Sequence, residues 1–409
     1  MPADSGSPEW QASLAFAAAP HRLLFLTGTL QVLLAMVWWS AWLVSVRWHG
    51  FELPTPAIPA GWLHAFVMQY QMLPPFFFGF LLTVFPRWMN LPPLSRRHYL
   101  PVGACLIGGQ LVTLFGMASI TTLRAGVLLT LAGWAWGVFL LARLAISEAG
   151  RSWHARSCLA ALGMGLLGLL FFLRFLSVFD ARWLFAAVQM GSTVVLLPVF
   201  LTVCHRMIPF FAGAVIRGYQ TVRPMWVLGA AWGLLLLHTV LVLLHDYQWS
   251  WVADAPLTFI TGWLLWRWWN PAALRIPLLL VLFAGFAWLP VAMALHTLQS
   301  VAFVITGQFM LGRAPLHALF VGCFGSLLVA MVTRVTQGHS GRPLTLGRIP
   351  ALCFLLLQGV AVLRILSELL PDSGLWQALA AIGWVVAFAP WVLRSAWIYL
   401  TPRTDGAPG

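Results

Sequence analysis

The chain has 409 residues, of which 61% are apolar and only 8% are charged, and its formal net charge is +13. A soluble domain carries about 25% charged residues, so this composition cannot cover a water-facing surface. The positive charges stand singly between apolar runs rather than in a basic stripe, which argues against nucleic acid as a partner. The chain is therefore expected to lie in a lipid bilayer.

Twelve apolar runs are each long enough to cross the hydrocarbon core as a helix, which takes about 20 residues. A helix satisfies its own backbone hydrogen bonds, which lipid cannot do. The sequence thus predicts an all-α, polytopic membrane bundle forming one domain over residues 1–409, with short cytoplasmic tails at 1–20 and 401–409. The expected spans are 22–45, 62–86, 99–119, 122–146, 155–179, 183–208, 222–246, 253–270, 275–297, 313–336, 347–370 and 374–400.

The basic residues orient these spans. All 23 are arginines. With the N-terminus in the cytoplasm, seventeen fall on the inner side, four fall in outer loops, and Arg174 and Arg364 lie within spans. This bias follows the positive-inside rule, so both termini are expected in the cytoplasm.

Several polar side chains share one depth in the outer third of the membrane. His64 and His317 lie about one turn inside the outer surface on spans 2 and 10, and His296 is expected at the outer end of span 9. Arg174 and Arg364 fall at a comparable depth. Charge at the bilayer centre costs about 2.5–3.5 kcal/mol, so such residues indicate a site. Imidazoles ligate haem iron or copper, and guanidinium groups pair with carboxylates such as haem propionates.

Simpler interpretations stay open for some of these residues. A histidine near a helix end is often only interfacial, and we interpret His49 and His245 in this way. Arg364 and Glu368, spaced i,i+4, can form a self-contained surface pair. His98 and His154, beside arginines in inner loops, are expected to be solvated.

A second group of histidines is predicted on the inner side. His339 belongs to the run G-H-S-G-R-P-L between spans 10 and 11. This loop is either a tight connector, with Arg334 and Arg342 facing lipid headgroups, or a cytoplasmic metal site in which His339 joins His205 and His21.

Several segments resemble the NnrS family, membrane proteins associated with haem, copper and the bacterial response to nitric oxide. Residues 331–344, MVTRVTQGHSGRPL, are similar almost letter for letter to that family's M-x-x-R-x-x-x-G-H-[ST]-G-R-P-L signature. Shorter similarities to family stretches occur at 316–322 (L-H-A…V-G), 79–88 (G-F-L-L-T…W), 206–211 (R-M-I-P-F-F) and 402–406 (P-R-T-D-G). Together they span almost the whole chain in order.

The resemblance implies a multi-pass protein of the bacterial inner membrane that binds haem and copper. Its implied role is in the nitric-oxide response, in denitrification or in protection from nitrosative stress. His64 and His317 both lie in stretches similar to the family's histidine-containing ones, and we predict that they ligate one haem, with Arg174 and Arg364 at its propionates. His296, His339 and His205 are the further candidate metal ligands.

Two stretches depart from the family pattern. The family's second span begins W-H-x-H-E-M, whereas Phe66 and Val67 stand here in place of the second His and the Glu. In span 9 the family has L-H where this chain has Leu282 and Phe283. The resemblance therefore does not extend to those ligand positions.

The sequence leaves other functions open. In span number and histidine placement alone the chain is similar to the haem–copper oxidase core subunit, whose spans 2 and 10 carry haem ligands, but that family's copper-site spacing is absent. Twelve spans interrupted by prolines also suit a small-molecule transporter. An assembly factor for a respiratory metalloenzyme is the third possibility. No residue is assigned a catalytic role, so whether the protein is an enzyme stays open.

Overall fold

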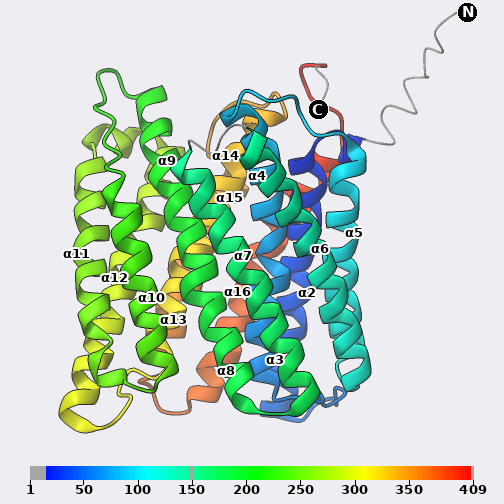
Figure 1. Ribbon diagram of the computed structural model, residues 1–409, viewed down its shortest axis with the longest axis vertical. Helices are drawn as coiled ribbons and strands as arrows, with labels where there is room; N and C mark the ends of the chain where they lie inside the picture. The colour runs from blue at the N-terminus through cyan, green and yellow to red at the C-terminus, as the bar shows by residue number, and fades with distance from the viewer. Residues whose placement is uncertain (1–14, 148–151, 407–409) are drawn as a thin grey trace, which may run out of the picture.

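A computed structural model describes residues 15–147 and 152–406, and these form a bundle of long helices with no strand among them (Figure 1). Arg151 and the ends of both predicted tails, residues 1–14 and 407–409, lie outside the described residues. The elements are η1 (Ala15–Ala17), α2 (Pro20–Trp48), α3 (Ala60–Phe66), η2 (Val67–Met72), α4 (Pro74–Trp88), α5 (Arg96–Phe115), α6 (Ile120–Ser147), α7 (Trp153–Val178), α8 (Ala181–Met190), η3 (Gly191–Leu196), α9 (Leu197–Val215), α10 (Trp226–Leu243), η4 (Tyr247–Trp249), α11 (Trp251–Trp268), η5 (Pro271–Arg275), α12 (Pro277–Thr306), α13 (Ala314–His317), η6 (Ala318–Gly325), α14 (Ser326–His339), α15 (Arg348–Leu366) and α16 (Ser373–Leu400).

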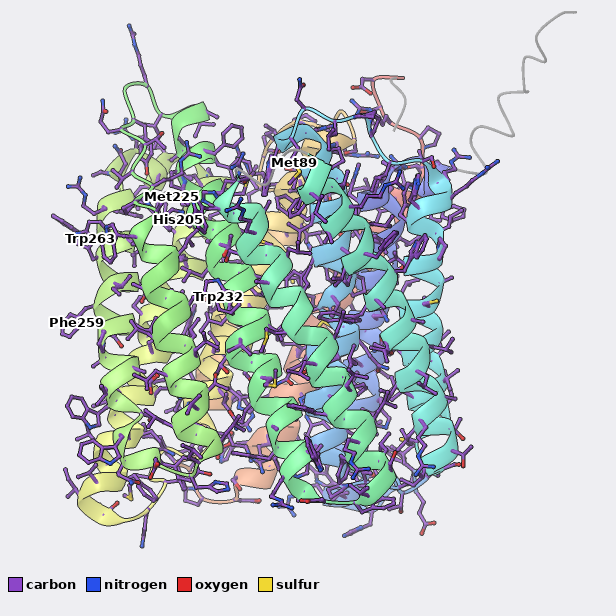
Figure 2. The ribbon with its side chains drawn as sticks, viewed as in Figure 1. Met89, His205, Met225, Trp232, Phe259 and Trp263 are labelled. Carbon is purple, nitrogen blue, oxygen red and sulfur yellow. The ribbon has the colours of Figure 1, made fainter. Side chains whose placement is uncertain are left out.

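Eleven spans of the described chain are long and apolar enough to cross a membrane. The helix that falls short is α11, which corresponds to the eighth and shortest of the twelve predicted spans and packs between α10 and α12. Its Phe259 and Trp263 project outward at the rim of the bundle, with Phe259 76% exposed, as suits a lipid-facing helix (Figure 2). The predicted polytopic helical fold is confirmed.

Three spans form the centre of the bundle. The spans Ala60–Trp88, Ala181–Val215 and Ala314–His339 bury 94%, 83% and 78% of their most apolar windows, whereas no other span exceeds 56%. These are spans 2, 6 and 10, and each contains a π-helical segment: η2, η3 and η6. The sequence shows no internal repeat, yet spans 2, 6 and 10, which are four spans apart, share both central burial and a π-helical segment. π-Helical turns inside α-helices occur frequently at functional sites.

Prolines account for two of these π segments. Pro74 directly follows Leu73 at the end of η2, and Pro198 stands two residues after η3. Proline has no N–H and its ring clashes with the carbonyl four residues earlier, so the preceding turn must widen. η6 instead contains Gly322, against which the Trp288 ring packs so closely that a Cβ would lie 2.5 Å from it.

Some span boundaries differ from the prediction. Span 9 was expected to end at residue 297, but α12 continues to Thr306, where Gly307 ends it in a left-handed conformation with φ +68°. His296 therefore lies well inside the helix rather than at its outer end, and that part of the prediction is wrong. Apolar side chains such as Val304 and Ile305 extend the helix beyond the expected bilayer edge.

Both described chain ends lie at the same end of the bundle (Figure 1), and the arginine distribution predicts that this end faces the cytoplasm. Ser340 of the G-H-S-G-R-P-L loop is buried, so it cannot report sidedness. Leu344→Cys, at a position 53% exposed, is expected to resist an impermeant thiol reagent in intact cells. Leu369→Cys, 54% exposed at the opposite end, is expected to react. The reverse pattern of labelling would contradict the orientation.

Candidate functional site

The outer ends of spans 2 and 10 bring His64 and His317 into one electrostatic environment. His64 lies on α3 and His317 ends α13, and the two imidazoles are close enough to interact with each other. The His64 ring stacks on Trp39 of α2, with centroids 4.3 Å apart and an interplanar angle of 12°. Its Nδ1 atom is buried and has no hydrogen-bond partner. A buried ring nitrogen without a partner is uncommon and points to a missing ligand or neighbour.

A backbone hydrogen bond fixes the tautomer of His317. Its Nδ1–H donates to the carbonyl oxygen of Arg313 at 2.9 Å. Since a neutral imidazole carries one proton, Nε2 is left with a free lone pair. Histidines that ligate metals are held in this way by a bond from the other ring nitrogen.

Two arginines surround this histidine pair, which we call the outer pair. Arg313 and Arg364 both interact electrostatically with His64 and His317. Arg364 also donates to Glu368 at 2.6 Å and to Ser367 at 2.8 Å. The self-contained pair of Arg364 and Glu368 therefore does form, but one positive charge remains beside the imidazoles. That excess suits an anionic ligand.

A short loop closes the outer pair from outside. Gly312, with φ +50°, packs against Glu368, whose Oε2 would lie 2.3 Å from an added Cβ. Gln299 of α12 holds the loop by accepting from the Leu311 N–H at 2.7 Å and donating to the Gly312 carbonyl at 3.3 Å. Only glycine fits here, because the position requires both a positive φ and close contact with Glu368.

Arg174 does not join the outer pair. It lies on an exposed face of α7, where Asp180 is an electrostatic neighbour. In the described chain the arginines that act electrostatically on both imidazoles are Arg313 and Arg364, so the structure groups Arg313, and not Arg174, with this pair. The sequence placed Arg313 in a loop, where a charge gives no depth signal.

At the three positions that depart from the family pattern, the side chains present here pack against neighbouring apolar residues. The Phe66 ring stacks on Phe172 at 3.9 Å, Val67 is fully buried beside it, and Phe283 packs edge-on against Trp269 at 5.4 Å. These three positions therefore belong to the apolar core of this chain.

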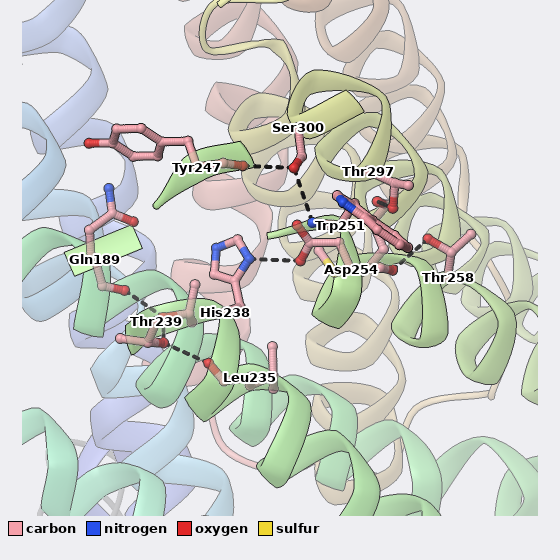
Figure 3. A network of polar contacts seen from close by, with 12 residues as sticks. Gln189, Leu235, His238, Thr239, Tyr247, Trp251, Asp254, Thr258, Thr297 and Ser300 are labelled. Atoms are coloured by element: carbon pink, nitrogen blue, oxygen red, sulfur yellow. Dashed lines mark hydrogen bonds and ion pairs between the residues drawn. The ribbon is translucent and has the colours of Figure 1, made fainter. Parts of the chain in front are cut away.

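A second polar network lies between α8, η3, α10, α11 and α12 (Figure 3). His238 Nδ1 lies 2.7 Å from Asp254 Oδ1, and both side chains are buried. Thr193 and Thr239 share a hydrogen bond of 2.6 Å at the same level. His296 packs edge-on against His238 with ring centroids 5.4 Å apart. Asp254 is the second residue of the eighth predicted span, where an acidic side chain gives no depth signal, so the sequence did not predict this group.

The His238–Asp254 pair is expected to contribute to stability. Asp254→Ala leaves His238 Nδ1 without an acceptor in a dry interior, which should lower the free energy of unfolding by about 3 kcal/mol. Asp254→Asn keeps an acceptor oxygen, so its loss should be about 1 kcal/mol. Unfolding titrations in mixed micelles measure both. Equal losses for the two variants would show that the hydrogen bond is unimportant.

Four histidines form two pairs at the inner end. His21 packs against His339 with ring centroids 4.4 Å apart, as the predicted inner site requires. His205 does not join them. Its Nδ1 lies 3.0 Å from His154 Nε2, and its own Nε2–H donates to the Pro224 carbonyl at 3.2 Å. His154 was expected to be solvated, but it is only 6% exposed, so that interpretation is wrong.

Four of the five segments that carry the family resemblance meet at this inner end, whereas residues 316–322 lie toward the outer end. Arg206 lies 4.1 Å above the Trp88 ring, and Arg334 lies 4.1 Å above the Phe211 ring. The loop is also tied to the C-terminal tail, because the Thr404 N–H donates to the Ser340 carbonyl at 3.2 Å. Figure 2 shows His205 toward this end of the bundle. These four motifs therefore build one structural unit.

The arginine of the G-H-S-G-R-P-L loop and the arginine of the C-terminal tail have pKa values shifted in opposite directions. Burial lowers the pKa of the Arg342 guanidinium, which lies 5.2 Å from the Trp397 ring. The hydrogen bond to Asp405 instead raises the pKa of Arg403. Arg334 is buried against Phe211 rather than facing headgroups, so the simple connector interpretation is incomplete.

The number of metal-binding side chains that lie together limits which kind of metal centre could fit. Within the described ranges, no cluster of three or more His, Cys, Asp or Glu side chains is arranged to hold a metal ion. Pairs of histidines do occur, at both ends of the bundle. A pair suits haem better than a bare ion, because the porphyrin already supplies four nitrogens and the protein only the axial ligands.

Comparison with known proteins agrees with these motifs. A family model described as NnrS protein matches residues 15–403, nearly the whole chain. The comparison with individually curated proteins returned no match. Because the match covers nearly the whole chain, including all twelve predicted spans, the chain belongs to the NnrS family.

Proposed function

We propose that this protein binds one haem at the outer pair and serves the nitric-oxide response of a bacterial inner membrane. The observation that carries the proposal is that His64 and His317, from two of the three central spans, lie within electrostatic range of each other and of Arg313 and Arg364. The free Nε2 of His317 and the unpartnered Nδ1 of His64 are consistent with ligand roles.

Each residue of the outer pair has a distinct part in this proposal. His64 and His317 would supply the nitrogen ligands of the iron, and Arg313 and Arg364 would neutralise the propionates. The loop at Gly312 and the Trp39 ring would exclude water from the iron. When bound there, haem would supply a one-electron couple and a coordination position for nitric oxide.

Copper, which the family resemblance implies, is proposed at the inner histidines on the spacing of their ring nitrogens. The Nδ1 of His205 and the Nε2 of His154 face each other at 3.0 Å, and the bond from His205 to Pro224 leaves that Nδ1 unprotonated. Two imidazole nitrogens so placed could hold one cuprous ion in place of the hydrogen bond. His21 and His339 form the alternative pair.

The function is tested in cells that lack this protein. A plasmid carrying the wild-type chain is expected to restore growth under a nitric-oxide donor, whereas His317→Ala, present at equal abundance in the membrane, should not. Full protection by His317→Ala would contradict a role for haem in the response. Restored uptake of a small solute by both proteins, without protection, would favour the transporter alternative.

A further inference from the structure

A small cavity lies where α2, α4, α9 and α14 meet, in the inner half of the bundle. Its volume is ≈ 60 Å³. The walls come from the three central spans and from Phe25 of α2, and they are apolar apart from the Cys204 thiol. Representative lining residues are Phe77, Leu81, Phe200, Leu328 and Met331.

The chemistry of the walls limits what can occupy this space. A buried water needs two to four polar partners, which a single thiol cannot provide, so the cavity is expected to be dry. A charged or strongly polar ligand would lose its hydration without compensation. The volume is several times the ~10–15 Å³ needed by one water-sized sphere, but well below the ~150 Å³ cavity that accepts benzene. One uncharged molecule of two or three heavy atoms fits these limits.

The surrounding contacts keep the cavity open and place it beside the inner histidines. Phe200 packs edge-on against Phe77 at 5.2 Å and stacks on Phe324 of η6 at 4.2 Å. On the cytoplasmic side Phe25 contacts His21, with centroids 6.2 Å apart, and His21 contacts His339. Rigid aromatic walls hinder the collapse that would otherwise fill an empty space.

We infer that this cavity binds a small apolar gas molecule, of the class of nitric oxide or dioxygen, which enters from the lipid. The choice of nitric oxide within that class rests on the proposed function, whereas the existence of the gas site does not. Such a site would hold the gas within the central spans, next to the His21–His339 pair.

Xenon is the probe, because it is apolar, monatomic and unreactive. Xenon-129 NMR of the purified protein in lipid nanodiscs is expected to show one saturable site. Leu328→Phe, which fills the cavity, should remove it, while Leu355→Phe, at a lipid-facing position 67% exposed, should leave it unchanged. If Leu328→Phe does not fold, Leu81→Ala provides the second arm, because enlarging the cavity should increase xenon occupancy. Absence of saturable binding to the wild-type protein, or binding insensitive to the cavity variants, would overturn the inference.

A further comparison separates the gas site from the haem proposal. His64→Ala is expected to bind xenon as the wild type does, because the outer pair is not part of the cavity wall. Nitric oxide should displace xenon from this variant. Xenon binding in a wild-type protein that contains no haem would contradict the proposed function alone. Failure of nitric oxide to displace xenon would contradict the assignment of the cavity to that gas.

Discussion

Replacing either His64 or His317 with alanine is expected to abolish the low-spin haem spectrum that we propose for the purified protein. Two imidazole ligands give a six-coordinate, low-spin iron, and loss of one leaves an open position and a weakly held haem. Absorption spectra and pyridine haemochrome assays of the two variants measure the change. Each substitution alone should be sufficient, because the ligands come from different spans and cannot replace each other.

His49→Asn is the matched control for these variants. His49 also lies at the outer end and is exposed, and its positive φ of 52° is one that asparagine tolerates. This variant should keep the wild-type haem content and spectrum. If haem is present and either alanine variant keeps an unaltered spectrum, that histidine is not a ligand, and His296 is the next candidate to test.

Arg22→Met is expected to cause the largest loss of stability. Arg22 is 2% exposed and donates to the carbonyls of Ala15 at 2.6 Å, Tyr399 at 2.8 Å and Ile398 at 3.3 Å, and to that of Thr401. It therefore satisfies the last carbonyls of α16 and places a positive charge at that helix end. Hydrogen bonds from a charged group contribute about 1.5–3 kcal/mol each. Because these four share one guanidinium group and their contributions are not additive, a total loss of about 4 kcal/mol is expected.

The measurement is the free energy of unfolding in mixed micelles, with Arg96→Met as the control. Arg96 begins α5 at the same end of the bundle but is exposed, so its replacement should change stability by less than about 0.5 kcal/mol. Equal effects of the two substitutions would show that Arg22 contributes only its charge, as one of the arginines that orient the spans in the membrane.

The sequence predicts the bundle well because apolar length is a direct consequence of bilayer thickness. It cannot predict which spans are central, because lipid and protein interior are both apolar, and a helix such as Ala60–Trp88 reads like any other. The end of span 9 was placed too early because His296 resembles an interfacial residue. Its burial depends on α10 and α11, which supply His238 and Asp254.

The outer pair was predictable because two histidines at matched depth on separate spans are rare in lipid. Of the two arginines near the outer pair, only one could be predicted from the sequence. Arg364 carried a depth signal, whereas Arg313 acts from a loop whose position depends on Gln299 and Gly312. His154 was missed for a similar reason, since only the packing of α7 against α9 places it beside His205.

The most direct test of the outer pair as a haem site is the low-temperature EPR spectrum of the oxidised, purified wild-type protein, recorded with its haem-to-protein ratio. We predict one haem per chain and a single low-spin ferric signal of the kind given by two imidazole ligands. A protein that contains no haem, or one whose signal is high-spin and unaffected by both His64→Ala and His317→Ala, would contradict the proposal.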